Sequence, residues 1–196
     1  MKRLTNTLNS AQIKYGTQKW YSSCQKPYVV IDLETTGLSS QYERIVEVCA
    51  IKFENGVETG RFVSLINPKK KISPAASQVN RITDKMVAAA PSFEDISDEL
   101  FAFMNGCFLV AHNAVFDIGF LEADFYRCNR DFKCVFYDTL DMARKIFPWL
   151  PNHKLQTVLN EIGHVRSEQH RGETDCEGCA AIMKYAVGAH ETRKSS

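Results

Sequence analysis

Two acidic residues stand two positions apart at the end of the first strongly apolar stretch of the chain. Asp32 and Glu34 follow a run of apolar residues that begins at Tyr28. On a β-strand, side chains at positions i and i+2 point to the same face, so these two carboxylates are expected to converge. Converging carboxylates repel each other unless a cation lies between them, and hard divalent metals prefer oxygen ligands. The pair therefore predicts part of a divalent metal site.

The spacing of this pair is by itself a weak signal. Asp175 and Glu177 have the same spacing, but we predict them on a helix, where residues two apart do not face each other. The position at the end of an apolar strand separates the first pair from the second.

A second group of polar residues follows the next apolar run of the chain, residues 107–111. Asn113, Phe116 and Asp117 come directly after this run. We expect a helix to begin there, with Asn113 and Asp117 one turn apart on the same face, so that the carboxylate points back toward the strand ends. In the alternative interpretation Asn113 only caps an exposed helix. That alternative does not explain an aspartate beside Phe116 and Ile118 on the apolar side.

A histidine and a further acidic residue lie near the end of the chain. His170 precedes Asp175 by five residues. We predict the histidine in a glycine-containing loop and the aspartate at the start of the last helix. A loop histidine with an ordinary pKa of ~6.5 can take a proton from water as a general base. Two alternatives stay open: Asp175 interacts only with the positive end of the helix dipole, and His112 has the same spacing to Asp117.

Strands that end near these residues, with helices between them, are needed to bring the residues together. Residues 28–33 form a short β-branched run that is typical of a strand buried on both faces. Residues 45–53 and 57–66 flank Asn55-Gly56 and predict an antiparallel hairpin. The remaining pattern predicts a loop at 68–74, strands at 107–111 and 134–137, and helices at 93–104, 114–126, 140–147, 155–162 and 174–187. This order predicts an α/β domain whose mixed sheet is covered by helices on both faces.

Length and composition favour a single folded domain. The chain has 196 residues, of which 44% are hydrophobic and 24% charged, and these values exclude disordered and fibrous classes. No apolar stretch approaches the ~18 residues of a membrane span, so no membrane partner is expected. The seven cysteines are odd in number and irregularly spaced, which is typical of a reduced compartment, and we expect a cytoplasmic protein.

Positive charge is concentrated at the N-terminus. The net charge is +1, but residues 1–26 contain five Lys or Arg and no Asp or Glu. We expect residues 1–26 to form a basic arm, residues 27–190 to form the main domain and residues 191–196 to form a short polar tail. The arm has three interpretations: a frayed terminus, a segment that packs on the domain or a partner chain, or a segment that follows nucleic-acid phosphates.

The ordered set of motifs resembles the DEDDh exonuclease family, in particular the DnaQ-like proofreading exonucleases related to the epsilon subunit of DNA polymerase III. The resemblance covers residues 28–188 and implies an RNase H-like fold with a mixed five-stranded sheet, in which an antiparallel hairpin adjoins parallel strands. The matching motifs are Asp32-x-Glu34, Asn113-x-x-Phe116-Asp117 and His170-x-x-x-x-Asp175.

The resemblance implies a metal-dependent 3′–5′ exonuclease that hydrolyses phosphodiesters at the 3′ ends of single-stranded DNA and releases nucleoside 5′-monophosphates, in proofreading or repair. It implies that His170 deprotonates the attacking water. Two divalent cations, Mg²⁺ or Mn²⁺, are implied to bind at Asp32, Glu34, Asp117 and Asp175. Contacts to the terminal nucleotide are implied at Thr35, Asn113, Phe116 and Asn80.

Two places depart from the family pattern. Asn80-Arg81 stands where the family often has His-Gly. Cys176 and Cys179 stand in the segment where the family continues with small apolar residues. With His164 and His170 upstream, the two cysteines allow a structural zinc site as an alternative, whereas the simpler interpretation is two small residues one turn apart on a packed helix.

Three functions are compatible with these motifs. The favoured one is an exonuclease on single-stranded DNA that acts alone or as a DNA polymerase subunit. The second is the same chemistry on RNA or on short oligonucleotides. The third is a non-catalytic subunit that only binds a polymerase or nucleic acid, and the presence of all four acidic positions and the histidine argues against it.

Overall fold

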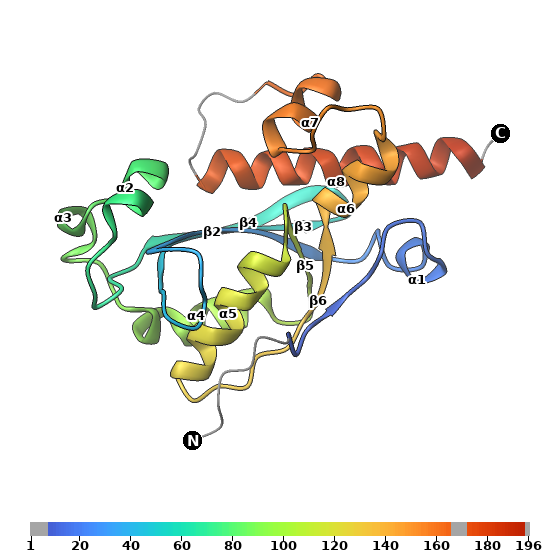
Figure 1. Cartoon of the computed structure of the whole chain (residues 1–196). Helices are drawn as coiled ribbons and strands as arrows, with labels where there is room; N and C mark the ends of the chain where they lie inside the picture. Colours follow the sequence, from blue (N-terminus) through green and yellow to red (C-terminus); the bar gives the residue numbers. More distant parts are fainter. Residues whose placement is uncertain (1–7, 166–171, 195–196) are drawn as a thin grey trace.

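A central six-stranded sheet organises the molecule (Figure 1), and the computed structural model describes residues 8–165 and 172–194. The strand order is β1-β6-β5-β2-β3-β4, with parallel pairing from β1 to β2 and antiparallel pairing from β2 to β4. The strands are β1 (Ala11–Gln12), β2 (Tyr28–Thr35), β3 (Ile45–Glu54), β4 (Val57–Leu65), β5 (Phe108–Ala111) and β6 (Val135–Asp138). The predicted hairpin with adjoining parallel strands is confirmed.

The sheet has one strand more than the five we predicted. The additional strand, β1, lies at the edge and is only two residues long, too short to show an alternating pattern in the sequence. Two backbone hydrogen bonds hold this segment to β6 and its approach, from Ala11 N to Cys134 O at 3.0 Å and from Ile13 N to Phe136 O at 2.8 Å. Part of the basic arm, at Ala11–Gln12, therefore adds an edge strand to the sheet.

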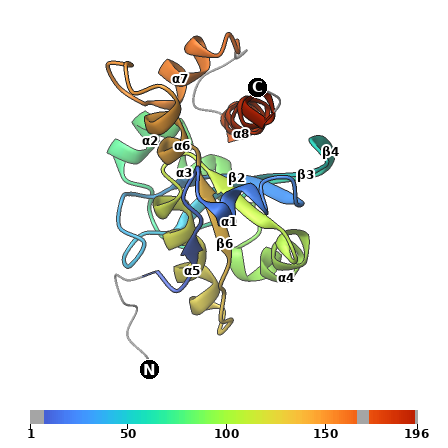
Figure 2. The same ribbon diagram turned by 90° about the vertical axis from the view of Figure 1, so that its right-hand side faces the viewer.

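Helices cover both faces of the sheet (Figures 1 and 2). The bundle of α4 and α5 lies on one face, and α8 crosses the other face with α6 beside it, while α7 packs on α8. The helices are α1 (Gln18–Tyr21), α2 (Pro74–Asn80), α3 (Asp84–Val87), α4 (Phe93–Met104), α5 (Val115–Arg127), α6 (Thr139–Ile146), α7 (Leu155–Glu161) and α8 (Gly172–Lys194).

The central strand β2 is apolar on both faces because each face supports its own core. Val29, Ile31 and Leu33 belong to the core under α4 and α5. Tyr28 and Val30 belong to the core under α8. Alternation of side chains along the strand makes this division, and it explains why the sequence reads as an uninterrupted apolar run rather than an alternating one.

Three short helices were not predicted. The sequence suggested only a loop at residues 68–74, but α2 begins at Pro74, whose fixed φ suits the first turn, and Ser73 caps it by accepting from Ala76 N at 3.1 Å. Helices α1 and α3 have four residues each, fewer than the two turns needed to reveal a 3.6-residue period. Trp20 of α1 is fully buried, so α1 packs firmly despite its length.

The described helices show no membrane-spanning candidate. None of them combines the length and the apolar character that crossing a bilayer requires.

Candidate active site

The site is built where β2 extends beyond its parallel neighbour. Pairing with β5 stops at Val30, whereas β2 continues to Thr35. The N-terminal turn of α5 occupies the space beside this extension, and Leu33 N donates to Asp117 Oδ1 at 3.1 Å. The Asp117 carboxylate thus satisfies an amide that no neighbouring strand reaches, which fixes the carboxylate at the edge of β2.

Asp32 and Glu34 lie on the face of β2 that α8 covers. Across the antiparallel pair they stand opposite Cys49 and Glu47 of β3, respectively. A Cβ atom placed on Gly172, the first residue of α8, would lie 3.6 Å from Asp32 Oδ2 and 3.3 Å from a Glu47 carboxylate oxygen. The start of α8 therefore closely approaches these acidic side chains, and only glycine allows this approach without a shift.

Mutual repulsion and burial act together on the three carboxylates. Burial, then Asp117 and Glu34, hold the pKa of Asp32 well above its usual range. Burial and Glu47 raise the pKa of Glu34 to about 7, although a hydrogen bond from Asn80 opposes the shift. Burial also raises the pKa of Asp117, against the hydrogen bond from Leu33 N–H. Among the described residues, no lysine or arginine is a main contributor to these three shifts.

Helix α8 carries the fourth acidic position, Asp175, in its first turn. The helix presents Cys176 to the sheet, where its Sγ contacts Cys49 O at 3.4 Å, and Gly178 to Leu159 of α7. With 3.6 residues per turn, Asp175 lies on the flank between these two directions. Asp175 lies about one turn along the helix from Gly172, and Gly172 adjoins Asp32. The helix therefore brings Asp175 to the same end of the sheet as the other three carboxylates.

The proposed base, His170, lies outside the described residues, in the segment 166–171. The other histidine with the same spacing, His112, is engaged by the protein. Its ring nitrogens bond Thr139 Oγ1 at 2.9 Å and His153 O at 2.8 Å, and burial lowers its pKa. His112 therefore joins the ends of β5 and β6 to the loop before α7.

The structure places Asn113 differently from our prediction. It precedes α5 in the left-handed region, with φ 65°, so it does not share a helix face with Asp117. Asparagine tolerates this conformation better than most residues, and its N–H donates to Asp138 Oδ1 at 3.0 Å. Phe116 is on the helix and half-buried, with its ring 4.9 Å from that of Phe120 between centroids.

Thr35 and Asn80 form one wall of the site. Both are buried. Asn80 Nδ2 donates to Thr35 O at 3.2 Å, and the Thr35 hydroxyl donates to Gly37 O at 2.7 Å. Their side chains are thus fixed by the protein and give the wall a defined shape.

Sequence reasoning missed two acidic residues at the site. Glu47 faces Glu34, but the pairing of β2 with β3 is not set by a short turn, so the sequence does not reveal this register. Asp138 ends β6, accepts from Asn113 N and caps α6 through Leu140 N at 2.9 Å. Its position at the end of the apolar strand β6 was the available signal.

The donor set fits hard divalent cations. It offers carboxylate oxygens, which such cations prefer as ligands. No lysine or arginine is among the described residues that act on the pKa values of Asp32 and Asp117, so the charge of these buried carboxylates is not balanced by a basic side chain. Within residues 8–165 and 172–194, no three His, Cys, Asp or Glu side chains are grouped closely enough to hold a metal ion by themselves. The described carboxylates are therefore an open set, in which a bound cation would supply the opposite charge needed for closer approach. Cys176 and Cys179 both lie buried against the core under α8.

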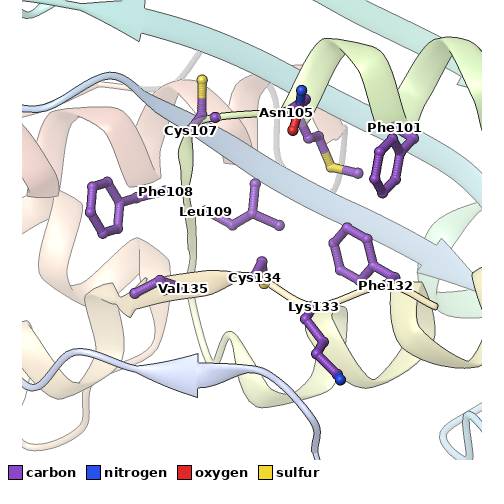
Figure 3. Close-up of a pocket in the computed structure, with 11 residues that line it drawn as sticks. Phe101, Asn105, Cys107, Phe108, Leu109, Phe132, Lys133, Cys134 and Val135 are labelled. Atoms are coloured by element: carbon purple, nitrogen blue, oxygen red, sulfur yellow. The ribbon is translucent and has the colours of Figure 1, made fainter.

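A separate pocket of about 300 Å³ lies at the other end of the parallel strands (Figure 3). Its walls include Phe108, which begins β5, and Cys134, which precedes β6, together with Phe101 and Phe132. The acidic residues lie at the carboxyl ends of the same strands, so this apolar pocket is not part of the candidate active site.

The chain matches a known protein family over most of its length. The profile of the exonuclease family (RNase_T) matches residues 29–183. The DNA polymerase III epsilon subunit of Treponema pallidum is 36% identical over 168 residues, covering 83% of this chain and 77% of the subunit. The PolC-type DNA polymerase III of Clostridium perfringens is 33% identical over 159 residues, and this chain spans only 11% of that longer protein.

A solved structure supports the same relationship. Exonuclease X in complex with 5′ overhanging duplex DNA superposes with a TM-score of 0.69 at 26% identity, covering 83% of this chain and 92% of exonuclease X. The predicted family and the RNase H-like fold are thereby confirmed. From the described carboxylates, the sheet order and these matches it follows that the chain belongs to the 3′–5′ exonuclease family, whose members depend on metal ions.

Proposed function

We propose that this chain hydrolyses single-stranded DNA from the 3′ end and releases nucleoside 5′-monophosphates with the help of two divalent cations, Mg²⁺ or Mn²⁺. The observation that carries the proposal is the convergence of Asp32, Glu34 and Asp117, whose pKa values are raised by burial and by neighbouring acids. A protein that only bound DNA would gain nothing from repelling carboxylates at its binding site.

Each acidic residue has a distinct task in this proposal. Asp32, which adjoins Gly172 and feels the charge of Asp117, would be shared by the two cations, Glu34 and Asp175 would complete one cation site, and Asp117 would serve the other. Bound metal supplies charge to activate water and to stabilise the leaving oxygen of an in-line displacement. His170 would accept the proton of the attacking water.

The neighbouring wall would hold the terminal nucleotide. Phe116 offers a half-buried ring, and stacking on an aromatic ring does not depend on base sequence. Thr35 and Asn80 shape the opposite side through their mutual hydrogen bond. Asn113, which is exposed at the entrance to α5, completes the proposed contacts.

The domain division and cellular role are part of the same proposal. Residues 27–190 contain the whole matched segment, residues 29–183, and would form the exonuclease domain. Residues 1–26 would form the basic arm and residues 191–196 the polar tail. The similarity to an epsilon subunit supports a role beside a DNA polymerase in proofreading or repair, in the cytoplasm.

End-labelled oligonucleotides test the proposal directly. Matched DNA and RNA strands, labelled at the 5′ end and incubated with Mg²⁺ or Mn²⁺, should shorten stepwise from the 3′ end, with DNA degraded faster. Asp32→Asn protein serves as the inactive control. Faster degradation of RNA would instead support the exoribonuclease alternative, and intact strands of both kinds would support a binding-only subunit.

A further inference from the structure

Arg81 holds a backbone conformation that arginine does not favour. It caps the C-terminus of α2 with φ 60° and ψ 14°, in the left-handed region. Five described residues other than glycine have positive φ, and three of them are asparagines, which tolerate this region. The other two are long basic residues, Lys69 and Arg81. Glycine would suit both positions better, so their side chains need a separate explanation.

The structure fixes the backbone of Arg81 on both sides. Arg81 N donates to Ser77 O at 2.9 Å. The preceding residue, Asn80, is buried and bonds Ile82 N at 3.0 Å, while Ser77 Oγ donates to Ile82 O at 2.7 Å. Ile82 is itself buried in a small core with Val46. Arg81 therefore cannot leave the left-handed region without breaking the wall to which it belongs.

This fixed point adjoins the candidate active site. Asn80 donates to Thr35 O at 3.2 Å and to the carboxylate of Glu34. Arg81 is thus one residue away from direct contacts to the end of β2. Its side chain is exposed, and within the described parts of the chain it forms no hydrogen bond or ion pair. A cation with no hydrogen-bond or ion-pair partner among the described residues is therefore attached at the rim of a strongly acidic site.

We propose that Arg81 binds a backbone phosphate of the nucleic acid strand near the 3′ end that the site holds. The inference rests on the proposed function, because the site must receive a 3′ end for Arg81 to meet its phosphates. Guanidinium groups pair well with phosphate oxygens. The same charge would offset part of the repulsion between the approaching strand and the carboxylates of Asp32 and Glu34.

Lys69 provides a matched control. It is also exposed and left-handed, with φ 53°, but it acts on Asp95 at the start of α4 rather than on the site. Arg81→Gly and Lys69→Gly each remove one positive charge and one unfavourable conformation. Both variants should melt about 2–4 °C above the wild type if each relieves roughly the conformational cost of a left-handed residue.

Binding of a single-stranded DNA oligonucleotide, measured across a salt series in an Asp32→Asn background, separates the two variants. Arg81→Gly should bind several-fold more weakly at low salt and lower the log–log salt slope by about 0.7, the value for one phosphate contact on a single strand. Lys69→Gly should keep the parent slope. Arg81→Lys should retain most of it, because lysine keeps the charge. Equal slopes for the two glycine variants would overturn the proposal.

Neutral methylphosphonate linkages, placed singly at the last three positions of the oligonucleotide, locate the contact. At one of the three positions, the neutral linkage should weaken the binding of protein that retains Arg81. The same linkage should not weaken the binding of the Arg81→Gly variant any further. Equal sensitivity of both proteins at all three positions would overturn the contact. Wild-type protein that degrades neither DNA nor RNA would contradict the proposed function itself. An active wild type with indistinguishable glycine variants would contradict only the role of Arg81.

Discussion

Helix α5 carries two buried aspartates, two turns apart, and the comparison between them separates structural from functional charge. Asp117 is 5% exposed and accepts from Leu33 N at 3.1 Å, whereas Asp124 is 2% exposed and accepts from Ile45 N at 3.2 Å. Each carboxylate therefore completes the backbone hydrogen bonding of a strand. Because both residues lie on the same face of α5, each accepts a hydrogen bond from a strand of the sheet.

The two aspartates differ in the charges around them. Asp124 Oδ1 lies 2.6 Å from Arg127 Nη1 and 4.0 Å from Arg44 Nε. Burial raises the pKa of both carboxyls, but Arg127 and Arg44 oppose the shift at Asp124, whereas Glu34 and Asp138 add to it at Asp117. A carboxylate buried for stability brings its own cation, because an unpaired charge is costly to bury. Asp117, the metal ligand that we propose, has no such basic partner among the described residues that act on its pKa.

Removal of a site carboxylate should have the largest effect on activity. Asp32→Ala is expected to lower nucleotide release by about 10³-fold or more, since metal stabilisation of the transition state contributes several kcal/mol. The metal-free variant should melt no lower than the wild type, because one repelling charge is gone. Nucleotide release and calorimetric melting are the measurements. Undiminished release from wild-type protein in excess EDTA would contradict the metal site.

His170→Ala should come next in size. A general base contributes about 10²–10⁴-fold to turnover, and the variant should bind single-stranded DNA normally because the carboxylates remain. Single-turnover cleavage and equilibrium binding measure the two properties. His112→Ala is the comparison: its two hydrogen bonds join structural elements, so that variant should lose stability. Normal turnover in His170→Ala would remove the residue from the proposed chemistry.

The paired aspartate should show the opposite pattern. Asp124→Ala leaves Arg127 and Arg44 without their buried partner and should reduce the free energy of unfolding by about 3 kcal/mol, the lower end for broken buried pairs, because Arg127 is 19% exposed. Protein that remains folded should still cleave DNA. Asp98→Ala provides a control, because Asp98 pairs with Arg130 at the surface, where such pairs contribute no more than about 1 kcal/mol. Equal losses in the two variants would contradict the comparison.

Stability of the metal-free protein should fall as pH rises. Glu34 has its pKa raised to about 7 in the folded state, against ~4.3 in the unfolded chain. Between these values the folded protein binds more protons, so deprotonation destabilises it, with a slope of up to about 1.4 kcal/mol per pH unit. Thermal melting from pH 4 to 8 measures the total slope, to which Asp32 and Asp117 also contribute through their raised pKa values; Glu34→Gln should reduce it and Asp98→Asn should leave it unchanged. Added Mg²⁺ should stabilise the protein most at the highest pH.

The sequence alone predicted those parts of the fold that repeat a pattern. The hairpin followed from Asn55-Gly56, and α4 and α5 from several turns of apolar periodicity. Strand β1 and helices α1 to α3 are too short to show a period, and they form because of tertiary contacts such as the burial of Trp20. Local pattern therefore located the long elements, whereas packing determined the short ones.

The candidate site divides in the same way. Asp32, Glu34 and Asp117 were predictable because strand ends and helix starts meet at one edge of an α/β sheet. Glu47 was not, because its position depends on the register between two strands that a nine-residue connection joins. The left-handed conformation of Asn113 could not be predicted from the sequence either. The backbone N–H of Asn113 donates to Asp138, and this contact forms only once β5 and β6 have paired.

The smallest expected effect concerns the exposed lysines of the basic arm. Lys26 lies just before β2 begins, so about six residues of extended chain, roughly 20 Å, separate it from Asp32 in the second half of the strand. That distance exceeds the Debye length of about 8 Å at physiological salt. Replacing Lys19 and Lys26 together with glutamine should therefore change the log–log salt slope for a short single-stranded oligonucleotide by much less than the ~1.4 expected for two phosphate contacts. A drop near that full value would show that nucleic acid also crosses the amino end of β2, and would extend the binding surface from the acidic site to the arm.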